Sequence, residues 1–170
     1  MSKDAVIILS GGMDSTTMLY EYHEEIALAI TFDYGSLQNA RERMYAIEHC
    51  KRFGIQHIII PLQVMQQYFK SSLLMTPDDI PEGNYDEENM KSTVVPFRNG
   101  TYEGVTVFAP YTHLSKTDIA RRGKQLGLDY TETYSCYKGG EKHCGQCGTC
   151  RERREALQEA GIDDKSPYES

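Results

Sequence analysis

The sequence predicts an α/β protein with a doubly wound parallel sheet, and the order of its apolar stretches is the main reason. Residues 5–9, 26–32 and 56–61 are short aliphatic runs of the kind found in strands buried on both faces of a parallel sheet. Two segments with the spacing of amphipathic helices, 15–23 and 38–53, separate these runs. A β-α-β-α-β order favours parallel strands joined by right-handed crossovers.

Both predicted helices are expected to pack on this sheet through apolar faces. In the first helix, Met18, Leu19 and Tyr22 should face the strands. Gly54 is expected to end the second helix, because glycine readily adopts the left-handed conformation found at helix C-termini. The predicted face of the second helix consists of Ala40, Met44, Ile47, Cys50 and Phe53. Cys50 is interpreted as a packed small side chain rather than a reactive thiol.

Between residues 62 and 100 the regular pattern fades. A helix is expected over 63–74. The following residues, 75–84, are rich in proline and acidic side chains, which is typical of a lid, a binding loop or a disordered segment.

The last part of the chain contains two further predicted helices. A strand over 105–109 and a turn over 110–114 lead to a helix capped by Ser115. Its buried face is predicted to consist of Ile119, Ala120, Gly123 and Leu126. A charged helix over 151–160 ends the regular structure, and the residues after it are expected to be loose.

The stretch Ser10-Gly-Gly-Met-Asp-Ser-Thr-Thr17 directly follows the first predicted strand and predicts an anion site. Gly11 and Gly12 allow the backbone to approach a ligand closely, and hydroxyl groups surround the same point. A helix beginning near Asp14 would direct its free N–H groups at the loop, an arrangement that suits phosphate. An ordinary strand-turn-helix connection is the alternative for a Ser-Gly-Gly triplet alone. No Walker pattern occurs in the chain.

Length and composition restrict the function classes. The chain has 170 residues, a formal net charge of −7 and 39% hydrophobic residues, which suits one globular domain. The acidic balance disfavours a broad contact with a nucleic-acid backbone and favours a small-molecule substrate. No apolar run has membrane-spanning length, and the first four residues lead directly into the first strand, so the expected location is the cytoplasm.

Four of the five cysteines, Cys136, Cys144, Cys147 and Cys150, lie within fifteen positions and predict a metal site. Glycines between them allow a short loop to fold around a tetrahedral ion. Four thiolates leave no open coordination position, so a zinc ion here should be structural. An iron–sulfur cluster is the alternative occupant, because the C-x2-C-x2-C spacing also occurs in ferredoxins. A zinc deaminase is disfavoured because the H-x-E motif is missing.

The loop sequence S-G-G-x-D-S-T-T resembles that of the PP-loop ATP pyrophosphatases, which cleave ATP between the α and β phosphates. Three other stretches are similar to the 7-cyano-7-deazaguanine synthases within that group. They are Phe32-Asp-Tyr-Gly35, Ser92-Thr-Val-Val-Pro-Phe-Arg-Asn99 and the cysteine-containing segment 134–153. The resemblance extends from Val6 to Gly161.

This resemblance implies an adenine nucleotide alpha hydrolase-like fold and a C–N bond-forming ligase of queuosine biosynthesis. The implied reaction converts 7-carboxy-7-deazaguanine and ammonia to 7-cyano-7-deazaguanine, with acyl-adenylate and amide intermediates, and consumes ATP with Mg2+. It also implies a homodimer, an ATP-binding part over 1–133, and a zinc-binding loop with a terminal helix over 134–170.

Site residues follow from the same resemblance. The implied catalytic residues are Asp14, Ser15, Arg98 and Lys116. Asp14 is expected to assist with magnesium, Arg98 to pair with a carboxylate or phosphate, and Lys116 to reach a phosphate. The implied nucleotide-binding residues are Leu9, Ser10, Gly11, Gly12, Met13, Asp14, Ser15, Thr16, Thr17, Met18, Leu19 and Asp33.

One departure from the family pattern affects this interpretation. In the family, an Arg-Asn-Gly sequence at this point opens a long helix followed by another parallel strand and a substrate-facing loop. Here Gly100 passes directly to Thr101, so one β-α unit is missing. The chain is either a naturally shortened variant or part of a polypeptide with more internal residues. Two alternative functions therefore stay open, a PP-loop tRNA-thiolating enzyme and a shortened, non-catalytic, zinc-stabilised binding protein.

Overall fold

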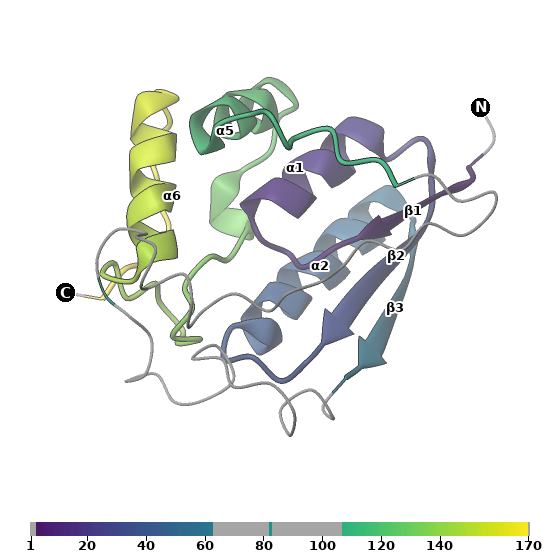
Figure 1. The fold of residues 1–170 in the computed structure, drawn as a ribbon, viewed down its shortest axis with the longest axis horizontal. Coiled ribbons are helices and arrows are strands. Elements are labelled where there is room, and N and C mark those ends of the chain that lie inside the picture. Colours follow the sequence, from purple (N-terminus) through teal and green to yellow (C-terminus); the bar gives the residue numbers. More distant parts are fainter. Residues whose placement is uncertain (1–2, 63–81, 83–106, 170) are drawn as a thin grey trace.

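The computed structural model describes residues 3–62, Glu82 and 107–169 of the chain (Figure 1). Its helices and strands are β1 (Ala5–Ile8), α1 (Met13–Tyr22), β2 (Ile26–Asp33), α2 (Asn39–Phe53), β3 (Gln56–Pro61), α5 (Lys116–Gln125), the 3-10 helix η3 (Tyr130–Glu132) and α6 (Gly148–Glu159). In this part of the chain, no helix is both long enough and apolar enough to cross a membrane.

Several predicted elements fall outside the described residues. They are the helix over 63–74, the loop over 75–84 except Glu82, and the stretch 92–99. Of the predicted strand 105–109, residues 107–109 are described and lie in no strand. The turn predicted over 110–114 is present, at residues 110–113.

The sheet has the order β1-β2-β3, and both pairs of neighbouring strands are parallel. Ile7 lies opposite Ala29 of β2, which in turn lies opposite His57 of β3. This topology confirms the β-α-β-α-β series and the α/β class. Because the strands are parallel, the loops after β1 and β2 both emerge at the carboxyl edge of the sheet, where open α/β sheets bind ligands.

Helices α1 and α2 cover one face of the sheet (Figure 1). The core beneath them contains Ile7, Leu9, Leu19, Ile26, Ala29, Ala46, Cys50 and Ile55. On the opposite face of β1, Val6 is 55% exposed and Ile8 is 53% exposed. The expectation that this strand is buried on both faces is therefore wrong for β1, because no helix of the described residues covers its second face.

The buried face of α2 differs from the predicted one. Met44 is 56% exposed and Ala40 is also exposed, whereas Ala46, His49 and Cys50 are buried. His49 donates a hydrogen bond from Nε2 to the carbonyl oxygen of Glu132 at 2.8 Å. Counting apolar residues could not find this face, since a satisfied polar histidine occupies its centre.

Helix α5 packs between α1 and α6. Ser115 and Asp118 form a capping box at its start, as the sequence predicts for Ser115. The core shared by these helices contains Met13, Tyr20, Ala120, Leu128, Tyr130 and Leu157. Through this packing, the first residue of α5, Lys116, is brought beside the N-terminus of α1.

The segment after α6 is ordered, which corrects the expectation that it is loose. Arg153 of α6 is 1% exposed and donates hydrogen bonds to the Asp164 carboxylate at 3.0 Å and the Ser166 hydroxyl at 2.9 Å. The His143 amide also donates to the Pro167 carbonyl oxygen at 2.9 Å. A buried arginine needs such partners, and the final residues supply them.

We expect Arg153→Met to lower the free energy of unfolding by about 3 kcal/mol, because it leaves the largely buried Asp164 carboxylate without its ion pair. Urea denaturation followed by circular dichroism measures this change. Arg151→Met is the matched control, since Arg151 is exposed on the same helix and should change stability by less than about 0.5 kcal/mol. Equal effects of the two substitutions would contradict this role for Arg153.

Candidate phosphate-binding loop and cysteine site

Hydroxyl groups fix the shape of the loop between β1 and α1. The Ser10 amide donates a hydrogen bond to the Ser15 hydroxyl at 3.3 Å, and the two hydroxyl oxygens lie 3.1 Å apart. The Gly12 amide donates to the Ser10 hydroxyl at 3.1 Å. These contacts join the turn to the first turn of α1 and stabilise its shape.

Gly11 is required at its position by two features. Its φ angle is +102°, a conformation that side chains with a Cβ rarely adopt. A Cβ at this position would also lie 2.0 Å from the carbonyl oxygen of Glu42 on α2. In addition, the Tyr134 amide donates to the Gly11 carbonyl oxygen at 3.1 Å. The loop backbone is thus packed directly against α2 and against the segment that leads to the cysteines.

Helix α1 begins with Gly12 as its N-cap, and no side chain caps it. The first amides of a helix lack intrahelical acceptors, and the helix dipole places partial positive charge at this end. Together with the turn at Gly11 and Gly12, these amides could accept an anion such as phosphate. The loop therefore has the tight turn and the helix start that the sequence predicts, and its binding of phosphate stays a prediction.

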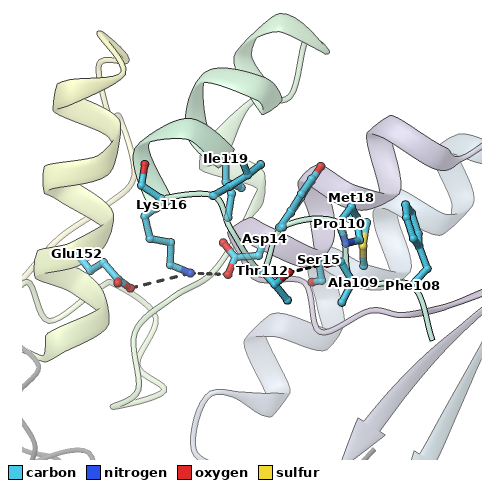
Figure 2. A pocket seen from close by; sticks show the side chains of 13 residues that line it. Asp14, Ser15, Met18, Phe108, Ala109, Pro110, Thr112, Lys116, Ile119 and Glu152 are labelled. Carbon is cyan, nitrogen blue, oxygen red and sulfur yellow. Dashed lines mark hydrogen bonds and ion pairs between the residues drawn. The ribbon is translucent and has the colours of Figure 1, made fainter. Parts of the chain in front are cut away.

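Two carboxylates and a lysine, from Asp14, Glu152 and Lys116, lie together beside the loop (Figure 2). The Lys116 ammonium group donates a hydrogen bond to Asp14 Oδ2, and it lies 4.0 Å from Glu152 Oε2. The other carboxylate oxygen, Asp14 Oδ1, is buried and has no hydrogen-bond partner among the described residues. Magnesium is commonly bound by one or two carboxylates together with substrate phosphates, so the free oxygen of Asp14 fits such an ion.

Two pockets meet at these residues. One has a volume of about 700 Å³ and is drawn in Figure 2, and the other, of about 330 Å³, lies over the loop itself. The residues common to both are Asp14, Ser15, Lys116 and Glu152. Apolar side chains of the first pocket include Met18, Phe108, Pro110 and Ile119. The polar group of the site therefore lies at the junction of the two pockets.

Glu42 of α2 also lines the pocket over the loop. Its Oε1 atom lies 3.5 Å from the position that a Cβ on Gly12 would occupy. Burial raises the pKa of Glu42 to about 7. Sequence reasoning missed both Glu42 and Glu152, since each is one acidic residue within a charged helix and only the packing of α2 and α6 brings them to the loop.

Thr17 and Asp33, which the sequence also predicts to bind the nucleotide, contact other residues of the protein. Thr17 is fully buried, donates to the Met13 carbonyl oxygen at 2.8 Å and lies 2.9 Å from the Tyr130 hydroxyl. Asp33, at the end of β2, pairs with Arg43 at 2.9 Å. Arg98 lies outside the described residues. The structure thus brings Asp14, Ser15 and Lys116 together.

The four predicted metal ligands form one buried cluster. Their sulfur atoms all lie within 4.8 Å of one another, with Cys144 and Cys150 at 4.0 Å, and none forms a disulfide. A tetrahedral ion with sulfur ligands at about 2.3 Å requires sulfur separations of about 3.8 Å. The Cys144 amide donates to the Cys136 sulfur at 3.3 Å, a contact typical of metal-bound thiolates. Hydrogen bonds from the Cys136 and Cys150 thiols lower the pKa of Cys147.

This cluster could hold a single metal ion. An iron–sulfur cluster fits less well, because it places its cysteines on different iron atoms and so further apart. Cys147 is the N-cap of α6, and Cys150 lies in the first turn of that helix. A bound ion would therefore join the start of α6 to the segment that begins at Cys136.

A parallel α/β sheet whose first strand leads into a glycine-rich turn and an uncapped helix, with an acid–lysine pair beside that turn, is typical of nucleotide-binding α/β proteins. The family model for the queuosine biosynthesis protein QueC matches residues 4–104 and, separately, residues 100–161. The chain belongs to this family.

Curated relatives agree with this assignment, and each is named 7-cyano-7-deazaguanine synthase. The protein from Porphyromonas gingivalis strain W83 is 49% identical over 215 aligned positions, which cover 98% of each chain. The relative from Desulfotalea psychrophila is 38% identical and covers 94% of this chain and 96% of its own. The relative from Methanoregula boonei is 39% identical, and the alignment covers 97% of this chain and 99% of the relative.

These alignments confirm that an internal segment is missing. The alignment with the Porphyromonas gingivalis protein has 215 positions, whereas this chain has 170 residues, so at least 45 positions face a gap. The two matches to the family model meet at residues 100–104. The gap therefore lies at or beside residues 100–104, a range that includes the Gly100–Thr101 junction where the sequence predicts it.

The cysteine cluster is expected to bind one metal ion per chain, since its four sulfurs match a single tetrahedral site. Elemental analysis of the purified protein measures the stoichiometry. Removing the ion with a chelator should lower the melting temperature, because metal binding contributes to folding. Cys50→Ser is the control, since Cys50 lies outside the cluster and should leave the metal content unchanged. A metal-free protein with an unchanged melting temperature would contradict the site.

Glu42 should make stability depend on pH. Its folded-state pKa of about 7 lies above the ordinary value of 4.5, so the folded state binds more protons than the unfolded state between these values. Stability should therefore fall as pH rises from about 4.5 to about 7. We expect Glu42→Gln to be more stable than the parent by about 3 kcal/mol at pH 8 and equally stable near pH 4.

Thermal denaturation across this pH range measures the difference. Glu48→Gln is the matched control, since Glu48 lies on the same helix and its side chain is 67% exposed. A constant difference between Glu42→Gln and the parent at all pH values would contradict the assignment.

Proposed function

We propose that this chain catalyses the ATP-dependent conversion of 7-carboxy-7-deazaguanine and ammonia to 7-cyano-7-deazaguanine. The observation that carries this proposal is the uncapped N-terminus of α1 with Asp14 and Lys116 beside it, in a chain of the QueC family. The name of the relatives, 7-cyano-7-deazaguanine synthase, supplies the product.

The reaction has two ATP-dependent stages. The substrate carboxylate attacks the α-phosphorus of ATP and forms an acyl-adenylate with release of pyrophosphate, and ammonia then displaces AMP to give the amide. A second ATP activates the amide oxygen, again with release of pyrophosphate, and loss of AMP and protons leaves the nitrile. The substrate supplies the nucleophile in each activation, so the protein needs no nucleophilic side chain.

The role of the protein in this reaction is to bind and orient the triphosphate. The loop amides and the N-terminus of α1 would hold the phosphates released as pyrophosphate, and Ser15 would maintain the turn. Lys116 would place a positive charge against the phosphates, where negative charge develops in the transition state. Asp14 would hold magnesium, which neutralises phosphate charge when it is bound.

The cluster of four cysteines would hold zinc in a structural role. Four sulfur ligands satisfy a tetrahedral zinc ion completely and leave no position for water. Because the four cysteines must stay reduced to bind the ion, we place the protein in the cytoplasm.

The family resemblance supports further proposals. Arg98 would contact the carboxylate or a phosphate, residues 1–133 would form the ATP-binding part and residues 134–170 the zinc-binding part. The active form would be a homodimer.

A second candidate is a shortened, zinc-stabilised protein that binds nucleotide without catalysis. The missing internal positions favour it, since part of the substrate pocket of the family would lie there. An intact-mass measurement shows whether the polypeptide is heavier than the 19.3 kDa expected for these 170 residues. A tRNA-thiolating enzyme is the third possibility, and measurable tRNA binding would favour it over the other two.

We expect the chain to catalyse exchange between ATP and labelled pyrophosphate only when 7-carboxy-7-deazaguanine is present. Asp14→Asn should lower the rate of this exchange roughly 100-fold, because it removes a magnesium-binding charge worth about 3 kcal/mol in the transition state.

Asp4→Asn is the control for this experiment, since Asp4 is an exposed acidic residue before β1 and should leave the rate unchanged. ATP binding without exchange would support the non-catalytic alternative. Exchange that is independent of the carboxylate substrate would contradict the proposed reaction.

A further inference from the structure

The Glu152 carboxylate lies close enough to the Lys116 ammonium group to interact with its charge. The Lys116 ammonium group lies between two carboxylates, since it donates to Asp14 Oδ2 and is 4.0 Å from Glu152 Oε2 (Figure 2). The three side chains are each between one third and one half exposed, at 33% for Lys116, 45% for Asp14 and 37% for Glu152. They form the junction between the two pockets of the site.

A close Asp14–Lys116 pair is a poor arrangement for binding a triphosphate if it cannot open. The proposed function needs the lysine to face phosphate and the aspartate to face a cation. Separating the pair exposes two opposite charges, and a second acceptor for the ammonium group reduces that cost. Among the described residues, Glu152 is the second carboxylate within 4.0 Å of the ammonium group, and it lies on the opposite side of that group from Asp14 (Figure 2).

The cysteine cluster lies at the start of the helix that carries Glu152. Cys147 is the N-cap of α6, Cys150 is in its first turn, and Glu152 follows two residues later. Both cysteines are fully buried, and the four sulfurs converge on one point. An ion bound there fixes the first turn of α6, and so fixes the residue that faces Lys116.

We propose that Glu152 is a positioning residue of the nucleotide site. It holds the Lys116 ammonium group in place for the triphosphate when Asp14 binds a cation instead. The metal-bound start of α6 keeps Glu152 in position for this role. This inference rests on the proposed binding of ATP by the loop. It assigns the cysteine site a part in nucleotide affinity in addition to its structural role.

The test is equilibrium binding of ATP with magnesium to the metal-loaded Glu152→Gln variant, measured by titration calorimetry. Simple electrostatics predicts that removing a negative charge near a triphosphate strengthens binding. The positioning role predicts the opposite, a loss of about tenfold in affinity. The melting temperature and metal content of the variant should equal those of the parent.

Two matched variants control this measurement. Glu155→Gln removes the same charge from an exposed position on α6, and it should not weaken binding. Glu152→Asp keeps the charge on a shorter side chain and should retain most of the affinity. A Glu152→Gln variant that binds ATP as well as the parent, or better, would overturn the inference.

Cobalt in the cysteine site gives a second readout, because its thiolate absorption bands respond to changes in ligand geometry. Addition of ATP with magnesium should change these bands in the parent and leave them unchanged in Glu152→Gln, since coupling between two sites is reciprocal. Identical spectral changes in both proteins, or none in the parent, would overturn the link to the metal site. A parent that binds no ATP would instead refute the proposed function.

Discussion

The close approach between Gly11 and the backbone of α2 is the constraint on which the site depends. No side chain fits between the two segments, since a Cβ on Gly11 would lie 2.0 Å from the Glu42 carbonyl oxygen. This packing fixes the direction in which the chain leaves β1 and enters α1. The N-terminus of α1 therefore points at the pocket, and Asp14 in its first turn lies within reach of Lys116. The Tyr134–Gly11 hydrogen bond connects the same turn to the cysteine segment.

Features that depend on local sequence were predictable. The three strands, the helix stop at Gly54 and the Ser115 cap each follow from a few neighbouring residues, and the structure confirms them. The four cysteines also converge as their spacing predicts. For these features, a short pattern in the chain contains most of the physical information.

Features that depend on tertiary packing were not predictable. The buried face of α2 is centred on His49, whose hydrogen bond to Glu132 joins segments far apart in sequence. Arg153 orders the C-terminal residues through partners that no periodic pattern indicates. Glu42 and Glu152 reach the loop only because α2 and α6 pack beside it. Neighbouring residues in the sequence do not distinguish a glutamate that lines a pocket from the exposed charged residues on the same helix.

The bridge between His143 and Tyr168 has a practical consequence for anyone preparing this protein. It places the last described residues against the cysteine segment, while the N-terminus lies at the distant, amino end of β1 (Figure 1). A histidine tag fused to the C-terminus would start beside the four thiolates and compete with them for added metal. Fusion at the N-terminus keeps such a tag at the opposite end of the molecule, and is the better choice for metal quantification.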